Sequence, residues 1–149
     1  MAADIGQKNN MGRVLTEIRV ENLNDLYAAR NGLITPEKVR RVTIPDAVVD
    51  TGATYLSLPA KVIRELGLSK AFTKRVMTSR GPADADVYDA VWLTIQDRSC
   101  TLDVMEVPDP VPALVGQLPL EHLDFVIDPV NQKVIGNPAH GGEQMYDLL

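Results

Sequence analysis

The sequence predicts one β-rich, all-β domain with two short helices, and three observations lead to this prediction. Apolar and polar residues alternate along several short stretches, as they do in strands that bury one face. Turn-forming residues separate these stretches, among them Asn31-Gly32 and residues 129–132. Helix start and stop signals appear at residues 59–67 and 119–123. The 149 residues, of which 45% are hydrophobic, suffice for one hydrophobic core.

The first half of the chain contains two predicted strands before a buried one. Residues 13–20 alternate and predict a half-exposed strand, and residues 26–30 suit a short helical turn. Residues 37–44 predict a second strand, which Pro45-Asp46 should end. In the helix expected at 59–67, the proline suits the first turn and the glycine suits the position just past the end.

The second half of the chain is dominated by predicted hairpins. Residues 74–78 and 87–96 predict a hairpin that projects from the body, with a long polar loop at 79–86. Further strands are expected at residues 100–107, 113–116, 125–128 and 133–135. We divide the chain into a flexible arm (1–12), one domain (13–138) and a C-terminal tail (139–149).

Composition excludes several classes of function. The net charge of −5 and the lack of a basic block argue against nucleic acid or an anionic membrane as partner. The longest apolar runs are far shorter than a membrane span, and no apolar region of a signal peptide follows Met1. The single Cys100 cannot form an internal disulfide, so we expect a cytoplasmic protein in which Cys100 is a core residue.

The segment Ala47 to Thr54 carries the strongest chemical signal. Its apolar run ends at Asp50, and aspartate is rarely buried without a partner. Thr51 adds a hydroxyl, and Gly52 allows a close approach that a side chain would block. A lone Asp-Thr-Gly triplet is most often only a turn. A second motif follows some sixty residues later, where two aliphatic residues and a glycine precede a leucine-bearing helix at 113–121.

With these two motifs, the chain resembles the retropepsin-like aspartic proteases, in particular their small bacterial members, over residues 13–138. The resemblance implies an acid-protease fold, a closed β-barrel-like single lobe that dimerises. It implies an endopeptidase in which Asp50 is catalytic, supported by Thr51, Gly52 and Ala53. Substrate-binding positions implied by the resemblance are Thr54, Ser79, Arg80, Gly81, Leu114, Val115 and Gly116, with a mobile flap at 78–89. No metal or cofactor is expected.

The chain has a single Asp-Thr-Gly, whereas the chemistry needs two carboxylates that share a proton. We therefore expect a homodimer that acts on a peptide or protein substrate, with Asp50 of each subunit facing the other across a two-fold axis. The chain departs from the viral pattern at Thr54 and Gln117, which are uncharged where relatives can form an ion pair. A hydrogen bond between these two side chains is the expected replacement.

The sequence also allows other interpretations of its function. The same fold can serve as a non-catalytic dimerisation or peptide-binding module. Metal sites find little support, because Glu121, His122 and Asp124 lie too close in sequence to imply zinc without further ligands. The acidic residues between 84 and 89 lack the spacing of a calcium loop, and His140 in the tail carries no signal of its own.

Overall fold

The computed structural model describes residues 13–148; the arm predicted at residues 1–12 lies outside the described residues. The strands are β1 (Val14–Asn22), β2 (Arg41–Val49), β3 (Leu56–Pro59), β4 (Lys70–Thr78), β5 (Gly81–Ile95), β6 (Arg98–Val107), β7 (Leu114–Val115), β8 (Phe125–Asp128) and β9 (Lys133–Gly136). The helices are α2 (Leu23–Arg30), α3 (Ala60–Leu66) and α4 (Gln117–Leu123), with 3₁₀ turns η1 (Pro36–Lys38) and η2 (Pro138–His140). None of the helices between residues 13 and 148 is long and apolar enough to cross a membrane.

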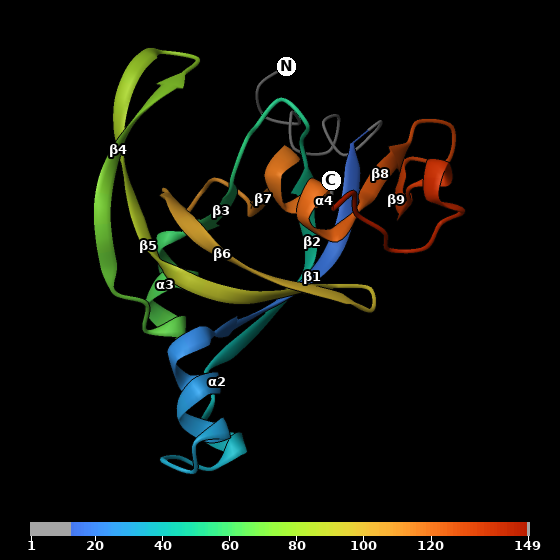
Figure 1. Cartoon of the computed structure of the whole chain (residues 1–149). Coiled ribbons are helices and arrows are strands. Elements are labelled where there is room, and N and C mark those ends of the chain that lie inside the picture. Colours follow the sequence, from blue (N-terminus) through green and yellow to red (C-terminus); the bar gives the residue numbers. More distant parts are fainter. Residues whose placement is uncertain (1–12, 149) are drawn as a thin grey trace.

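One sheet forms the body of the molecule. Its strand order is β1-β2-β7-β3-β6-β5-β4, and an additional pairing of β1 with β5 closes the sheet into a ring (Figure 1). Strand β4 stays outside the ring and pairs with β5 alone. The β-rich fold class and the single retropepsin-like lobe predicted from the sequence are therefore confirmed. A separate small sheet contains the predicted hairpin of β8 and β9.

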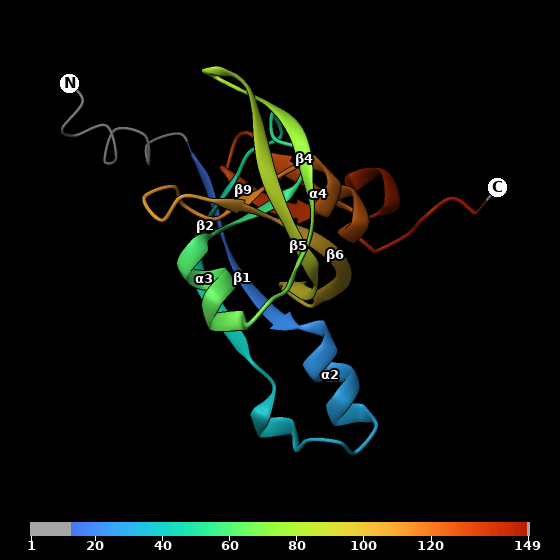
Figure 2. The ribbon, with the colours of Figure 1, turned by 90° about the vertical axis from the view of Figure 1, so that its left-hand side faces the viewer.

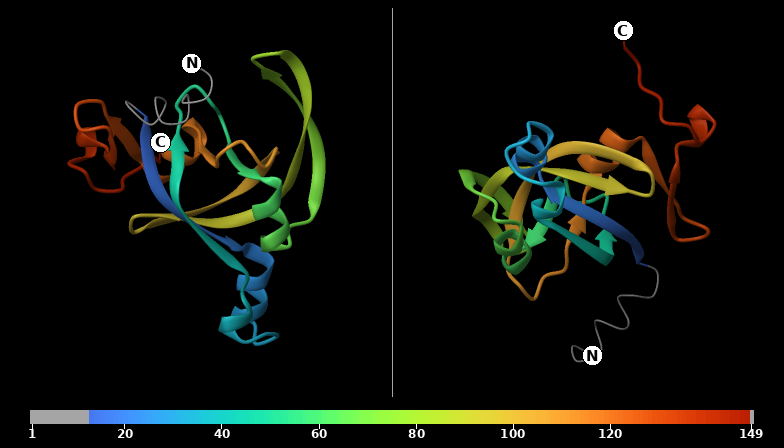
Figure 3. Two further views of the ribbon diagram at one scale, coloured as in Figure 1. Left: turned by 180° about the vertical axis from the view of Figure 1, so that it is seen from behind. Right: turned by 90° about the horizontal axis from the view of Figure 1, so that it is seen from below.

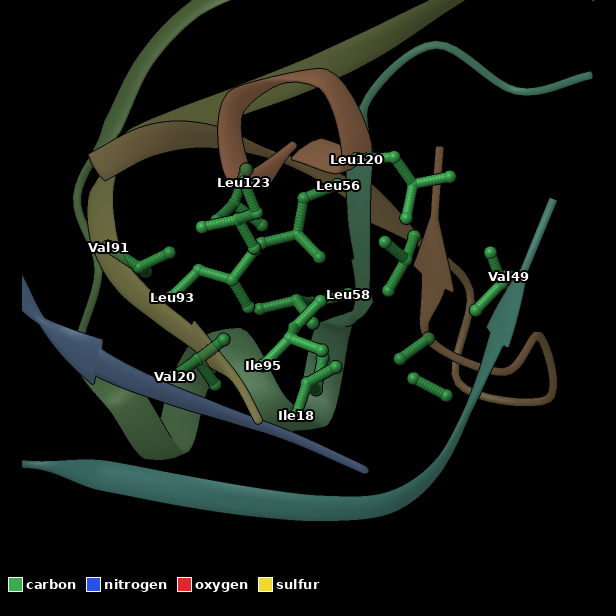
Figure 4. Close-up of a cluster of buried hydrophobic side chains, with 14 of the residues drawn as sticks. Ile18, Val20, Val49, Leu56, Leu58, Val91, Leu93, Ile95, Leu120 and Leu123 are labelled. Carbon is green, nitrogen blue, oxygen red and sulfur yellow. The ribbon is translucent and has the colours of Figure 1, made fainter. Parts of the chain in front are cut away.

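The core fills the inside of this ring (Figure 4). Aliphatic side chains from β1, β3, β5 and α4 meet there, and each fully buried one stabilises the fold by about 1.5–3 kcal/mol. The largest fully buried side chains are Ile18, Leu56, Leu58, Leu66, Leu93, Ile95, Leu120 and Leu123. On β5 the buried residues include Val87, Val91, Leu93 and Ile95, the residues whose spacing predicts one buried face.

Strand β2 differs from the prediction at both of its expected limits. It begins at Arg41, after the turn η1, and not at Glu37. It also continues through Pro45 and Asp46, although the sequence predicts that these two residues end a strand. The register with β1 shifts between Thr16 and Ile18, so one residue of β1 lies opposite two of β2. This bulge accommodates the proline, because a bulged residue need not donate a ladder hydrogen bond.

Helix α2 is longer than the turn predicted at 26–30 and gives the molecule a third helix. Asn22 caps it, since its side chain accepts a hydrogen bond from the Asp25 N–H at 3.0 Å. The Asn22 amide also donates to the Leu66 carbonyl at 2.8 Å, which ties the start of α2 to the end of α3. None of its residues is buried, and it projects at the end of the molecule opposite the β4–β5 hairpin (Figures 1 and 2).

The β4–β5 hairpin projects as predicted, but its loop is much shorter than expected. Strand β4 ends at Thr78 and β5 begins at Gly81, so only Ser79 and Arg80 form the turn. The prediction of a long polar loop at 79–86 is therefore wrong. Charged pairs across the strands hold the polar residues in register, and Gly81 has a φ of 103°. A bulge at residues 89–90 marks the point where β5 stops pairing with β4 and starts pairing with β1. The hairpin leaves the ring at this bulge.

Candidate active site

Asp50 follows the last residue of β2 and is exposed to solvent. Its N–H donates to the Val115 carbonyl at 3.0 Å, which continues the pairing of β2 with β7 by one residue. The Asp50 carbonyl accepts a hydrogen bond from Ala53 at 3.0 Å, and its carboxylate accepts one from the Gly52 N–H at 2.9 Å. The turn of residues 50–53 therefore fixes the direction of the carboxylate with backbone groups alone. A Cβ on Gly52 would lie 3.1 Å from the Asp50 Oδ1.

The N-terminal end of α4 packs directly on this turn. The first N–H groups of a helix have no partner within the helix, so other groups must accept their hydrogen bonds. Here Gln117 N–H donates to the Ala53 carbonyl and Leu118 N–H to the Thr54 carbonyl, each at 2.9 Å. Gly116 N–H donates to the Tyr55 carbonyl at 3.0 Å. The Asp-Thr-Gly motif and the second motif, about sixty residues apart in sequence, are thus one structural unit.

Gly116 has no space for a side chain. A Cβ there would lie 2.6 Å from the Thr54 carbonyl carbon and 2.7 Å from the oxygens of Ala53 and Tyr55. All three atoms belong to the backbone and cannot rotate away. The glycine of the second motif is therefore required by close packing, since its φ of −86° is open to any residue.

The side-chain hydrogen bond expected between Thr54 and Gln117 is not formed. The Gln117 amide instead donates to the Glu121 carboxylate at 3.0 Å, one helical turn further along α4. The backbone hydrogen bonds already join the loop to the helix, so the side chain of Gln117 is free to pair along the helix surface. Thr54 is exposed.

The hairpin tip and the Asp50 loop lie at the same end of the molecule (Figures 1 and 3). Among residues 13–148, no hydrogen bond joins the tip residues Ser79, Arg80 and Gly81 to residues 50–54. The tip is held by its own bonds, in which Thr78 Oγ1 donates to the Gly81 carbonyl at 2.7 Å. Leu114 and Val115, in contrast, pair directly with β2 and β3 beside the loop.

Other titratable groups of the described residues show little sign of a different chemistry. Burial raises the pKa of the Cys100 thiol to about 11, so the thiol is protonated at neutral pH and is a poor nucleophile. The Tyr88 hydroxyl donates to Glu106 at 2.6 Å, and this bond raises the pKa of Tyr88 to about 12. Within the described part of the chain, no group of three His, Cys, Asp or Glu side chains could hold a metal ion.

A second polar cluster lies at the C-terminal end of α4, where the sequence analysis predicted none. Asp124 is buried and has a φ of 57°. Its carboxylate accepts hydrogen bonds from His140 Nδ1 at 2.6 Å and the Met145 N–H at 3.0 Å, and it lies 3.4 Å from Asn137 Nδ2. The bond from His140 contributes most to lowering the pKa of Asp124. This cluster ties the tail to the domain.

Arg98 completes the cluster. Its guanidinium is buried and donates to the carbonyls of Leu123 and Asp124, at 2.9 and 2.8 Å, and to that of Gly142 at 2.6 Å. It also stacks 4.5 Å from the centre of the Phe125 ring. Arg98 and Asp124 are 26 residues apart, and no local spacing in the sequence pairs them.

Comparison with known families agrees with this geometry. The family model of the aspartyl proteases matches residues 32–129, about two thirds of the chain. The matched region contains the Asp50 turn, the β4–β5 hairpin and the Gly116 contact with α4. No curated protein is significantly similar in sequence to the chain. On the family match, the chain belongs to the aspartyl protease family.

Proposed function

We propose that the chain is an aspartic endopeptidase that works as a homodimer, with Asp50 of both subunits in one shared site. The observation that carries the proposal is the Asp50 turn, an exposed carboxylate whose direction is fixed by backbone hydrogen bonds. Membership in the aspartyl protease family supports peptide hydrolysis. Because the sequence holds one Asp-Thr-Gly and hydrolysis needs two carboxylates, each chain supplies half of the site.

In this mechanism the two Asp50 carboxyl groups have opposite roles. The ionised one removes a proton from a water molecule, whose oxygen attacks the peptide carbonyl carbon. The protonated one gives its proton to the carbonyl oxygen, which yields a tetrahedral diol. The C–N bond then breaks as the leaving nitrogen takes the proton that the first carboxyl received from water. One diol hydroxyl returns its proton to the second carboxyl, and the pair is restored.

The remaining site residues then have supporting roles. Thr51 would brace the two loops across the axis, while Gly52 and Ala53 keep the turn compact beside the carboxylate. The residues that would contact the peptide are Thr54, Leu114, Val115 and Gly116 in the cleft and Ser79, Arg80 and Gly81 at the hairpin tip. Closure of the hairpin over bound peptide would exclude water from the reacting groups. A cytoplasmic location remains a prediction from the single cysteine.

The test is incubation of the purified protein with a mixed peptide library, with products identified by mass spectrometry. We expect cleavage by the native protein and a loss of at least about 1,000-fold in kcat/KM for Asp50→Asn, because the substitution removes the proton-transferring group. Asp46→Asn is the matched control: it makes the same change at an exposed position four residues earlier and should keep full activity.

Cleavage that persists in Asp50→Asn would overturn the mechanism. Peptide binding without cleavage by the native protein would support the other interpretation, a dimerisation or peptide-binding module.

A further inference from the structure

A cavity of about 300 Å³ is lined by residues of β3, β4, β5, β6 and α4. Tyr55 and Leu118 form part of its wall, and both are linked to that loop. Tyr55 follows Thr54 in the chain, and the Leu118 N–H donates to the Thr54 carbonyl at 2.9 Å. A peptide bound over Asp50 can therefore place the side chain of a residue a few positions from the cleaved bond in this cavity.

The lining of the cavity is mostly apolar and includes one lysine. Leu56, Val104 and Met105 contribute buried apolar surface. The cation is Lys74, which reaches the cavity from β4 of the projecting hairpin. An apolar floor with a single ammonium group suits a side chain that has methylene groups and ends in a carboxylate.

Lys74 differs from the other two cations of β4. Lys70 pairs with Asp86 and Arg75 with Asp84, each at 3.2 Å. Lys74 has no carboxylate within 4.0 Å among residues 13–148. Of these three cations, Lys74 alone lines the cavity.

Aromatic contacts hold the Lys74 ammonium in place. Its Nζ lies 4.9 Å from the centre of the Tyr55 ring and 5.5 Å from that of Phe72, and it donates to the Tyr55 hydroxyl at 3.3 Å. A cation that is already positioned loses less conformational entropy when it binds an anion. None of these contacts neutralises the positive charge, and no carboxylate of residues 13–148 pairs with it.

We propose that this cavity is a specificity subsite that takes an acidic side chain of the peptide substrate, glutamate in particular, and that Lys74 pairs with its carboxylate. The inference rests on the proposed function, since it assigns the substrate class of the same site. Asp103 and His122 also line the cavity. Asp103 is exposed and lies outside ion-pair distance of Lys74, so it does not pair with the ammonium group.

The test compares peptides that differ at one position. Starting from a sequence that the protein cleaves, matched peptides carry Glu, Gln or Lys at each position near the cleaved bond, and kcat/KM is measured for each. At one position we expect Glu to exceed Gln by about three- to tenfold, the effect of one partly exposed charged hydrogen bond. Lys74→Met should bring that ratio close to one, and Lys74→Glu should make Lys the preferred residue.

Lys70→Met is the matched control, because it removes the same charge from the same strand outside the cavity. It should keep the preference for Glu. The subsite would be overturned if Lys70→Met and Lys74→Met lowered the Glu-to-Gln ratio of kcat/KM equally. It would also be overturned if the native protein preferred Glu at no position.

A binding experiment separates this inference from the proposed function. The Asp50→Asn protein, which should not cleave, is incubated with the mixed peptide library, and the retained peptides are identified. We expect enrichment of acidic peptides that is lost when Lys74→Met is added. If the native protein cleaves no peptide but the Asp50→Asn protein still enriches acidic peptides, the proposed protease function is refuted and the subsite is not. If the native protein cleaves peptides but neither cleavage nor binding depends on Lys74, the subsite is refuted and the protease function is not.

Discussion

At its N-terminal end, α4 is joined to the Asp50 loop by backbone groups, whereas at its C-terminal end it is joined to the tail by charged side chains. The first contact consists of N–H to carbonyl bonds from residues 116–118 to residues 53–55. The second gathers the side chains of Arg98, Asp124 and His140 around the last turn of the helix. One seven-residue helix thus connects two regions with different chemistry.

This difference has physical consequences. Backbone hydrogen bonds do not titrate, so the position of the Asp50 loop relative to α4 should be insensitive to pH. The pKa of Asp124 is lowered in the folded protein, chiefly by its bond with His140, so the Asp124 cluster should respond to acid. We therefore expect changes at the N-terminal end to alter activity, and changes at the C-terminal end to alter stability with little effect on activity.

The largest effect on activity is expected for Gly116→Ala. The added Cβ would lie within 2.7 Å of three backbone atoms, so the Asp50 loop or α4 must move. Overpacking of this kind costs about 1–3 kcal/mol of unfolding free energy. A displacement of the catalytic group by about 1 Å can lower kcat about 100-fold. Urea denaturation and kinetics on one cleaved peptide measure the two effects.

The control for Gly116→Ala is Gly32→Ala, in the turn after α2. Gly32 has a φ of 76° and nothing within 4 Å of its Cβ position, so backbone strain is its only cost, about 1–2 kcal/mol. Its kcat should be unchanged. Native kcat in Gly116→Ala would contradict the close packing inferred at the loop.

Arg98→Met should lower the unfolding free energy and have a smaller effect on activity than Gly116→Ala. The substitution keeps much of the side-chain volume but leaves three backbone carbonyls without their buried donor. We expect the unfolding free energy to fall by about 2–4 kcal/mol. The kcat of the protein that remains folded should stay within about twofold of the native value. A loss of kcat as large as that of Gly116→Ala would abolish the contrast between the two ends of α4.

A smaller and pH-dependent effect is expected for Asp124→Asn, which keeps a residue type that tolerates the positive φ. The pKa of Asp124 is lower in the folded protein than in the unfolded chain, so its ionised form favours folding above about pH 4. This contribution is lost as the pH falls through the folded pKa. The melting temperatures of the native and variant proteins should therefore differ at about pH 6, and the difference should narrow as the pH falls below about 4.

Asp46→Asn, at an exposed position, serves as the control for this series and should follow the native curve at every pH. A difference between Asp124→Asn and the native protein that stays constant down to pH 3 would mean that ionisation of Asp124 does not stabilise the fold.

The same comparison explains what could be predicted from the sequence. The strand that ends before Asp50 and the C-cap at Gly67 follow from local patterns, and the structure contains both. The helix predicted at 119–123 is also present, but it begins two residues earlier, at Gln117. The length of the β4–β5 strands did not follow, because their polar residues are paired across the hairpin and carry no apolar alternation. The continuous course of β2 through Pro45 depends on a bulge that only its partner strand reveals.

The Asp124 cluster and the position of Lys74 could not be predicted from local sequence patterns either. Both depend on contacts between residues that are far apart in sequence, such as Arg98 with Gly142 and Lys74 with Tyr55. Charged residues have no periodicity that reports such partners. A motif whose residues are required by close packing can be recognised in a single sequence, whereas a polar contact between distant residues cannot.

A subunit-mixing experiment tests most directly whether two chains each contribute Asp50 to one active site. Native and Asp50→Asn proteins are unfolded together in equal amounts, refolded and assayed at constant total concentration. If two chains share one site, random pairing leaves about one quarter of the dimers with both carboxylates, so the activity should fall to about one quarter of the native value. An activity of about one half, linear in the native fraction, would mean that each chain works alone and would contradict the account.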